Sequence, residues 1–168
     1  HDRALLGDPA SMGPSDAFAF RELAPMHLEW LRSWPTTLRI GHEVMLFHAT
    51  PDDDDRYLLE DPATGYARLR PADAVAEALQ GVEERLMLCG HTHVPRVFGL
   101  ADGRVVVNAG SVGLPAYTDD TGGFHRHENG SPHARYALVD LLPSGMQAAI
   151  GAVDYDWDAA SRQAARNG

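Results

Sequence analysis

The sequence has no lysine and only one cysteine. All 14 basic residues are arginine, 24 residues are acidic, and the formal net charge is -10. This balance argues against a broad basic surface for nucleic acid, so an anionic substrate would need a few local arginines or bound cations. The lone Cys89 cannot form an internal disulfide, which predicts a reducing, cytoplasmic compartment.

Long apolar runs are also missing. A typical unbroken run, VMLF at 44–47, is far too short to cross a bilayer, so we expect a soluble protein. A length of 168 residues with 44% hydrophobic residues predicts a single globular domain spanning 1–168. The chain opens on His1 instead of Met, so we expect either a cleaved leader or a segment of a longer chain.

The hydrophobic spacing predicts a strand-rich α/β fold with three helices. The predicted helices are 19–34, 71–81 and a last one that starts after Asp156. The predicted strands and hairpins are 36–51, 85–89, 96–110, 135–141 and 146–153, with an Asp102-Gly103 turn in the third. The segments 51–70 and 114–133 are expected to be long polar loops.

The turn GHTH at 90–93 places two imidazoles one residue apart, and neutral imidazole is a common metal ligand. Alternate residues of an extended chain point to the same side, so His91 and His93 are expected to face one site. His48 ends the apolar run VMLF, at the kind of strand end that often carries functional groups. The other histidines considered are expected to be solvated or locally hydrogen-bonded: His27, His42, His125, His127 and His133.

Three segments resemble the later motifs of the calcineurin-like metallophosphoesterase family: HATP at 48–51, CGHTHVPRV at 89–97 and NAGSVGLPAY at 108–117. The opening HDRALLGD resembles the tail of that family's Gly-Asn-His-Asp motif. GSPHARYALVD at 130–140 resembles a small bacterial phosphodiesterase-like branch. The family's first Asp-x-His, its Gly-Asp and the Gly-Asn of its third motif do not occur in the sequence.

The resemblance implies a four-layer α-β-β-α sandwich with two mixed sheets, of which this chain is the larger, C-terminal part without the N-terminal strands. It also implies two divalent transition metal ions, Mn, Fe or Zn, and a hydroxide between them that attacks phosphorus. His48 and His91 would bind one ion and His93 the other. His1 would protonate the leaving group, with Asp2 orienting it.

On the substrate side, Asn108, Ser111 and Arg135 are the predicted contacts. A buried turn that needs small residues would explain Asn108 and Ser111 equally well, and a solvated role is open for Arg135. Tyr117 could contact substrate too. The expected partner is a small phosphorylated molecule, with nucleotides among the candidates, rather than a membrane or an extended nucleic acid. The oligomeric state stays open.

Two other functions fit the same residues. The chain could be a non-catalytic metallophosphoesterase-fold scaffold, or a module with one structural zinc ion, although a core of this size does not need a metal to fold. The acidic run at 52–55 is interpreted as a solvated loop. Cys89 is interpreted as an inert core residue and not a nucleophile.

Overall fold

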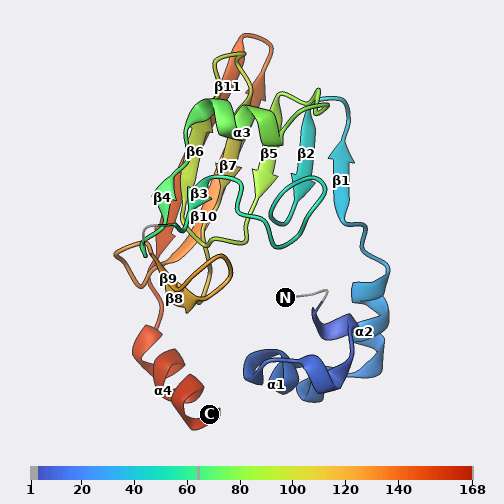
Figure 1. The fold of residues 1–168 in the computed structure, drawn as a ribbon, viewed down its shortest axis with the longest axis vertical. Coiled ribbons are helices and arrows are strands. Elements are labelled where there is room, and N and C mark those ends of the chain that lie inside the picture. Colours follow the sequence, from blue (N-terminus) through green and yellow to red (C-terminus); the bar gives the residue numbers. More distant parts are fainter. Residues whose placement is uncertain (1–3, 64, 168) are drawn as a thin grey trace. The chain divides into compact units, whose positions relative to one another are not determined.

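The computed structural model describes residues 4–63 and 65–167. These form two compact units, one of residues 1–35 with 158–168 and one of residues 36–157 (Figure 1). The prediction of one domain over 1–168 stays a prediction. None of the helices in the described part of the chain is long and apolar enough to span a bilayer.

The first unit is helical. Its elements are η1 (Ala4–Leu6), η2 (Pro9–Ser11), α1 (Pro14–Glu22) and α2 (Pro25–Arg32), with most of α4 (Trp157–Asn167). The predicted single helix over 19–34 is wrong, because the segment is divided at Pro25. Leu23 is extended there, with φ -81° and ψ 131°, and ends α1. Proline lacks the N–H that would continue α1, but it suits the first position of α2.

A five-stranded mixed sheet forms the centre of the second unit (Figure 1). In spatial order its strands are β1 (Thr37–Ile40), β2 (Val44–Phe47), β5 (Leu86–Cys89), β7 (Val105–Asn108) and β6 (Arg96–Gly99). β2, β5 and β7 run parallel, while the edge strands β1 and β6 are antiparallel to their neighbours. Both predicted hairpins are therefore confirmed, and Gly103 in the second has φ 89°, as its turn requires.

Alternate residues of the central strands face opposite layers. On one face, Met45 and Met87 pack with Val75 and Leu79, which come from α3 (Ala72–Ala78) and its C-terminal end. On the other face, residues such as Val44 pack against a hairpin of β10 (Ala134–Leu142) and β11 (Gly145–Val153). The described residues thus show a mixed α/β arrangement with one mixed sheet, and the second sheet is represented by this antiparallel hairpin.

Both predicted long loops contain short strands. The segment 51–70 contains β3 (Glu60–Asp61) and β4 (Arg68–Leu69), and Leu58 and Leu59 in it are buried in the core. The prediction of a loop over 114–133 is wrong, since β8 (Ala116–Asp119) and β9 (His125–Glu128) pair in antiparallel register there. The Gly-rich turn between β8 and β9 conceals this hairpin from a composition-based prediction.

Candidate functional site

The candidate site lies where the parallel strands β2, β5 and β7 end. His48 follows β2, the turn at 90–93 follows β5, and Asn108 is the last residue of β7. The Gly90 N–H donates to the His48 carbonyl at 2.9 Å, and Cys89 lies opposite Asn108 in the β5–β7 register. The sheet therefore brings His48 and the two turn histidines together, because parallel strands end at the same edge.

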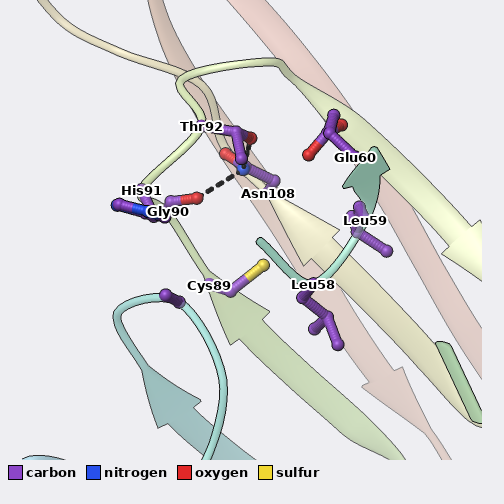
Figure 2. Close-up of a pocket in the computed structure, with 9 residues that line it drawn as sticks. Leu58, Leu59, Glu60, Cys89, Gly90, His91, Thr92 and Asn108 are labelled. Atoms are coloured by element: carbon purple, nitrogen blue, oxygen red, sulfur yellow. Dashed lines mark hydrogen bonds between the residues drawn. The ribbon is translucent and has the colours of Figure 1, made fainter. Parts of the chain in front are cut away.

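The backbone of the turn is left-handed at both histidines, with φ 63° at His91 and 59° at His93. The expectation of an extended chain here is wrong. A non-glycine residue in this region costs on the order of 1–3 kcal/mol, so the surroundings must hold it in place. Asn108 does so: its amide Nδ2 donates to the Gly90 carbonyl at 2.7 Å and to Thr92 Oγ1 at 3.0 Å (Figure 2).

Two backbone carbonyls orient the imidazoles. His91 Nε2 lies 3.0 Å from the Asp55 carbonyl oxygen, and His93 Nδ1 lies 3.1 Å from that of Leu114. A carbonyl only accepts, so these two nitrogens carry the protons, and the lone pairs are left on His91 Nδ1 and His93 Nε2. Metal-binding histidines commonly donate their other N–H to a carbonyl in this way.

Burial lowers the pKa of both His91 and His93 below the usual value for histidine. Both rings are therefore neutral at neutral pH. A metal ligand must present a lone pair, so this protonation state suits coordination.

His48 and His91 are spaced like two ligands of one ion. His48 Nε2 lies 3.2 Å from His91 Nδ1. Zinc–nitrogen bonds of about 2.0–2.1 Å at angles between octahedral and tetrahedral separate two ligand nitrogens by about 2.9–3.4 Å. The pair thus fits a shared cation, although no group of three or more His, Cys, Asp or Glu side chains within 4–63 and 65–167 is placed to hold a metal ion.

The other predicted site residues are placed as follows. His1 and Asp2 lie outside the described residues. Asn108 is 1% exposed, and its Oδ1 also accepts from the Gly110 N–H, so its contacts are those of a buried turn. Ser111 Oγ accepts from the Leu114 N–H at 2.9 Å, and its carbonyl accepts from the Arg135 N–H at 3.0 Å.

Arg135 lies beside this turn. A Cβ added at Gly110, which has φ 87°, would meet Arg135 Cβ at 3.0 Å, so glycine permits the close approach. Arg135 Nε is buried and has no hydrogen-bond partner in the described part of the chain. A buried donor of this kind can bind an anion.

A small pocket lies beneath the turn, and Figure 2 shows Cys89, Thr92 and Glu60 on its walls. It holds about 160 Å³ of empty space, less than the roughly 300–1,000 Å³ of typical ligand pockets. Burial, with the nearby Glu60 carboxylate, raises the pKa of the Cys89 thiol to about 12. The thiol is therefore not a ready nucleophile, as predicted.

The acidic run forms an ordered turn. Thr50 Oγ1 donates to Asp52 Oδ1 at 2.9 Å, and Asp53 Oδ1 accepts from the Asp55 N–H at 2.8 Å. Asp55 contributes its backbone carbonyl to His91. The interpretation of this run as only a solvated loop therefore missed a structural contact to the site.

His125 and His127 were also missed. They are 0% and 1% exposed, so the expectation that they are solvated is wrong. His125 does have a local hydrogen bond, from Nδ1 to the Gly123 carbonyl at 2.7 Å. The signal in the sequence was the alternation His-Arg-His-Glu at 125–128, whose period of two matches the buried and exposed faces of β9.

The fold matches solved metallophosphoesterase structures. A metallophosphoesterase from Sphaerobacter thermophilus superposes with a TM-score of 0.67 at 23% identity, covering 98% of this chain and 69% of that one. Vps29 with zinc from Entamoeba histolytica gives a TM-score of 0.36 at 14% identity, with coverage of 70% and 59%. Vps29 from Cryptosporidium parvum gives 0.33 at 15%, with 73% and 58%.

The two Vps29 matches are too weak to carry an argument. No family model and no curated protein sequence matches the chain. The chain has a metallophosphoesterase-like fold, and the resemblance seen in the sequence motifs is confirmed at that level.

Proposed function

We propose that the protein is a metal-dependent phosphoesterase that hydrolyses a small phosphorylated substrate, either a diester or a monoester. The observation that carries this proposal is the separation of 3.2 Å between His48 Nε2 and His91 Nδ1. The carbonyl bond that fixes the proton of His91 on Nε2 supports it. A lone pair of one ring and a nitrogen of the other thus face the same point at a sheet edge.

In this proposal His48 and His91 hold one divalent transition metal ion, Mn, Fe or Zn, and His93 binds a second through Nε2. Two such ions, when bound, activate water and neutralise the phosphoryl oxygens. Asp55 and Leu114 act through their carbonyls, which hold the ligand rings in orientation. The acidic chain can then hold a phosphate ester, because the cations supply the positive charge.

Arg135 is the proposed protein contact of the phosphate, supported by its buried and unpaired Nε. Ser111 lies next to it through a backbone hydrogen bond. The contacts of Asn108 favour a role in holding the turn over direct substrate binding. His1 as leaving-group acid and Asp2 as its orienting partner remain part of the proposal.

We propose also that the complete domain is a four-layer α-β-β-α sandwich in which the β10–β11 hairpin belongs to the second mixed sheet. The inner face of the hairpin packs on the five-stranded sheet. Its outer face exposes Tyr136, Leu138 and Leu142. An apolar outer face is expected of a strand pair that further elements cover.

The test is hydrolysis by the intact protein of a panel of phosphomonoesters and phosphodiesters, including nucleotides, with and without added Mn²⁺. We expect Mn²⁺-dependent turnover of at least one class, which chelation abolishes. Cation binding without hydrolysis of any substrate would instead support the non-catalytic scaffold. Absence of both binding and hydrolysis would contradict the proposal.

A further inference from the structure

His127 is a buried imidazole whose polar atoms have no protein partner. It is 1% exposed, and neither ring nitrogen has a hydrogen bond in the described part of the chain. A neutral imidazole has one donor and one acceptor, and leaving a buried polar group unsatisfied costs about 1–3 kcal/mol. A phenylalanine ring could fill similar space without that cost. Packing alone therefore does not explain a histidine at this position.

The rings around His127 connect it to both turn histidines. The Tyr57 ring centroid lies 4.8 Å from that of His127 and 4.9 Å from that of His91. Tyr117 stacks on His127 at 4.8 Å and 10°, and lies 5.3 Å from His93. His127 is thus the middle of a chain of five rings whose ends are the two proposed ligands.

The wall behind this chain is anchored. The Tyr57 hydroxyl donates to Asp119 Oδ2 at 2.7 Å and lies 3.0 Å from His125 Nε2. These contacts tie the segment before β3 to the β8–β9 hairpin. His127 is therefore held close to the proposed cation site by more than its own strand.

The protonation state of His127 leaves it able to bind. Burial, assisted by the neighbouring His125, lowers the pKa of His127 to about 4. The ring is neutral at neutral pH, so it offers one lone pair and one N–H to a ligand.

We propose that His127 is an additional positioning residue of the cation centre, which hydrogen-bonds through a ring nitrogen to the hydration shell of a divalent cation near His91 and His93. Contact across a water suits the arrangement, because one tyrosine ring lies between His127 and each of those histidines. This inference rests on the proposed function, since it takes both turn histidines as ligands.

The test compares His127→Phe with wild type in the intact protein. Thermal unfolding without cations and calorimetric titration with Mn²⁺ alone are the two measurements. We expect the cation-free variant to melt at the wild-type temperature or above, because two unsatisfied polar atoms are removed. We expect its Mn²⁺ affinity to fall by about 10- to 100-fold, as for other residues that support metal ligands.

His127→Gln, which keeps a donor and an acceptor, is expected to retain affinity between those of wild type and His127→Phe, and it serves if the phenylalanine variant does not fold. His42→Phe, in the exposed turn at the other end of β2, is the matched control and should bind as wild type does. Unchanged affinity in both His127 variants overturns the inference and leaves the proposed function standing. So does a lower melting temperature in cation-free His127→Phe, which would show a structural role. Wild-type protein that binds no Mn²⁺ overturns the proposed function itself.

Discussion

The chain contains two His-x-His patterns that fold in opposite ways. In the turn after β5, His91 and His93 both adopt left-handed backbone angles, and each has a ring nitrogen near a backbone carbonyl. In β9, His125 and His127 lie on the buried face of a regular strand. The spacing in the sequence is the same, but the backbone decides what the rings can reach.

The difference shows how strain and burial divide the work. The turn pays backbone strain to place lone pairs at a sheet edge, and Asn108 stabilises it from within. The strand carries no such strain and supplies rings that pack behind the turn. A single His-x-His match therefore indicates little until the backbone around it is known.

The largest contrast between the two patterns should be in cation binding and hydrolysis. In the intact protein, His91→Ala or His93→Ala removes a proposed ligand, so Mn²⁺ affinity should fall by more than the about 10- to 100-fold that supporting residues typically contribute. Turnover should fall with it. His42→Ala is the control for loss of an imidazole elsewhere. Wild-type amounts of bound Mn²⁺ in both variants, measured by mass spectrometry, would contradict the ligand assignment.

The pH dependence of stability should follow the buried rings. The pKa of His127 is lowered to about 4 in the folded state, while an unfolded histidine titrates near 6.5. Below about 6.5 the unfolded chain takes up a proton that the folded ring refuses, so stability is full above that pH and falls toward about pH 4, by on the order of 3 kcal/mol for this ring. The lowered pKa values of His91 and His93 act in the same direction.

Urea unfolding of the cation-free protein across this range measures the effect. His127→Phe should flatten the curve between about pH 6.5 and 4. An equal pH dependence in wild type and variant would show that another group is responsible.

Glycine substitutions should separate the two backbones. His93→Gly relieves a left-handed conformation that costs about 1–2 kcal/mol, and the extra freedom of glycine in the unfolded chain offsets part of that gain. Its free energy of unfolding should stay within about 1 kcal/mol of wild type. His125→Gly loses a buried ring and a hydrogen bond, and should destabilise by about 2 kcal/mol or more. Equal losses in the two variants would remove the contrast.

The smallest effect is expected for Tyr117→Phe. Its hydroxyl donates to the His91 carbonyl at 3.4 Å, a long bond. Its removal should change stability by only about 0.5 kcal/mol, because the stack on His127 remains. Tyr136→Phe, on the exposed face of β10, is the matched control. A large drop in Mn²⁺ affinity for Tyr117→Phe alone would mean that this hydroxyl, and not the ring stack, supports the turn.

The sequence predicted the central sheet well. The Asp-Gly turn at 102–103, the apolar runs of β2 and β5, and the alternation in β10 are local signals that the packed fold reinforces. It also predicted that His48 and the turn at 90–93 would meet, because strands of one parallel sheet end together.

Other features could not be predicted from local patterns. Pro25 divided a helix whose apolar spacing was continuous. The pairing of β8 with β9 buried His125 and His127, and that depends on long-range contacts with Tyr57. The left-handed angles of His91 and His93 depend on Asn108, 15 residues further along the chain from His93.

The central claim is that His48 and His91 share one cation. The direct test is a crystal of the intact protein soaked in Zn²⁺, with diffraction data collected above and below the zinc absorption edge. The account predicts an anomalous peak about 2.0–2.1 Å from both His48 Nε2 and His91 Nδ1. Density that shows these two nitrogens still in direct contact, with zinc bound elsewhere or not at all, would contradict it.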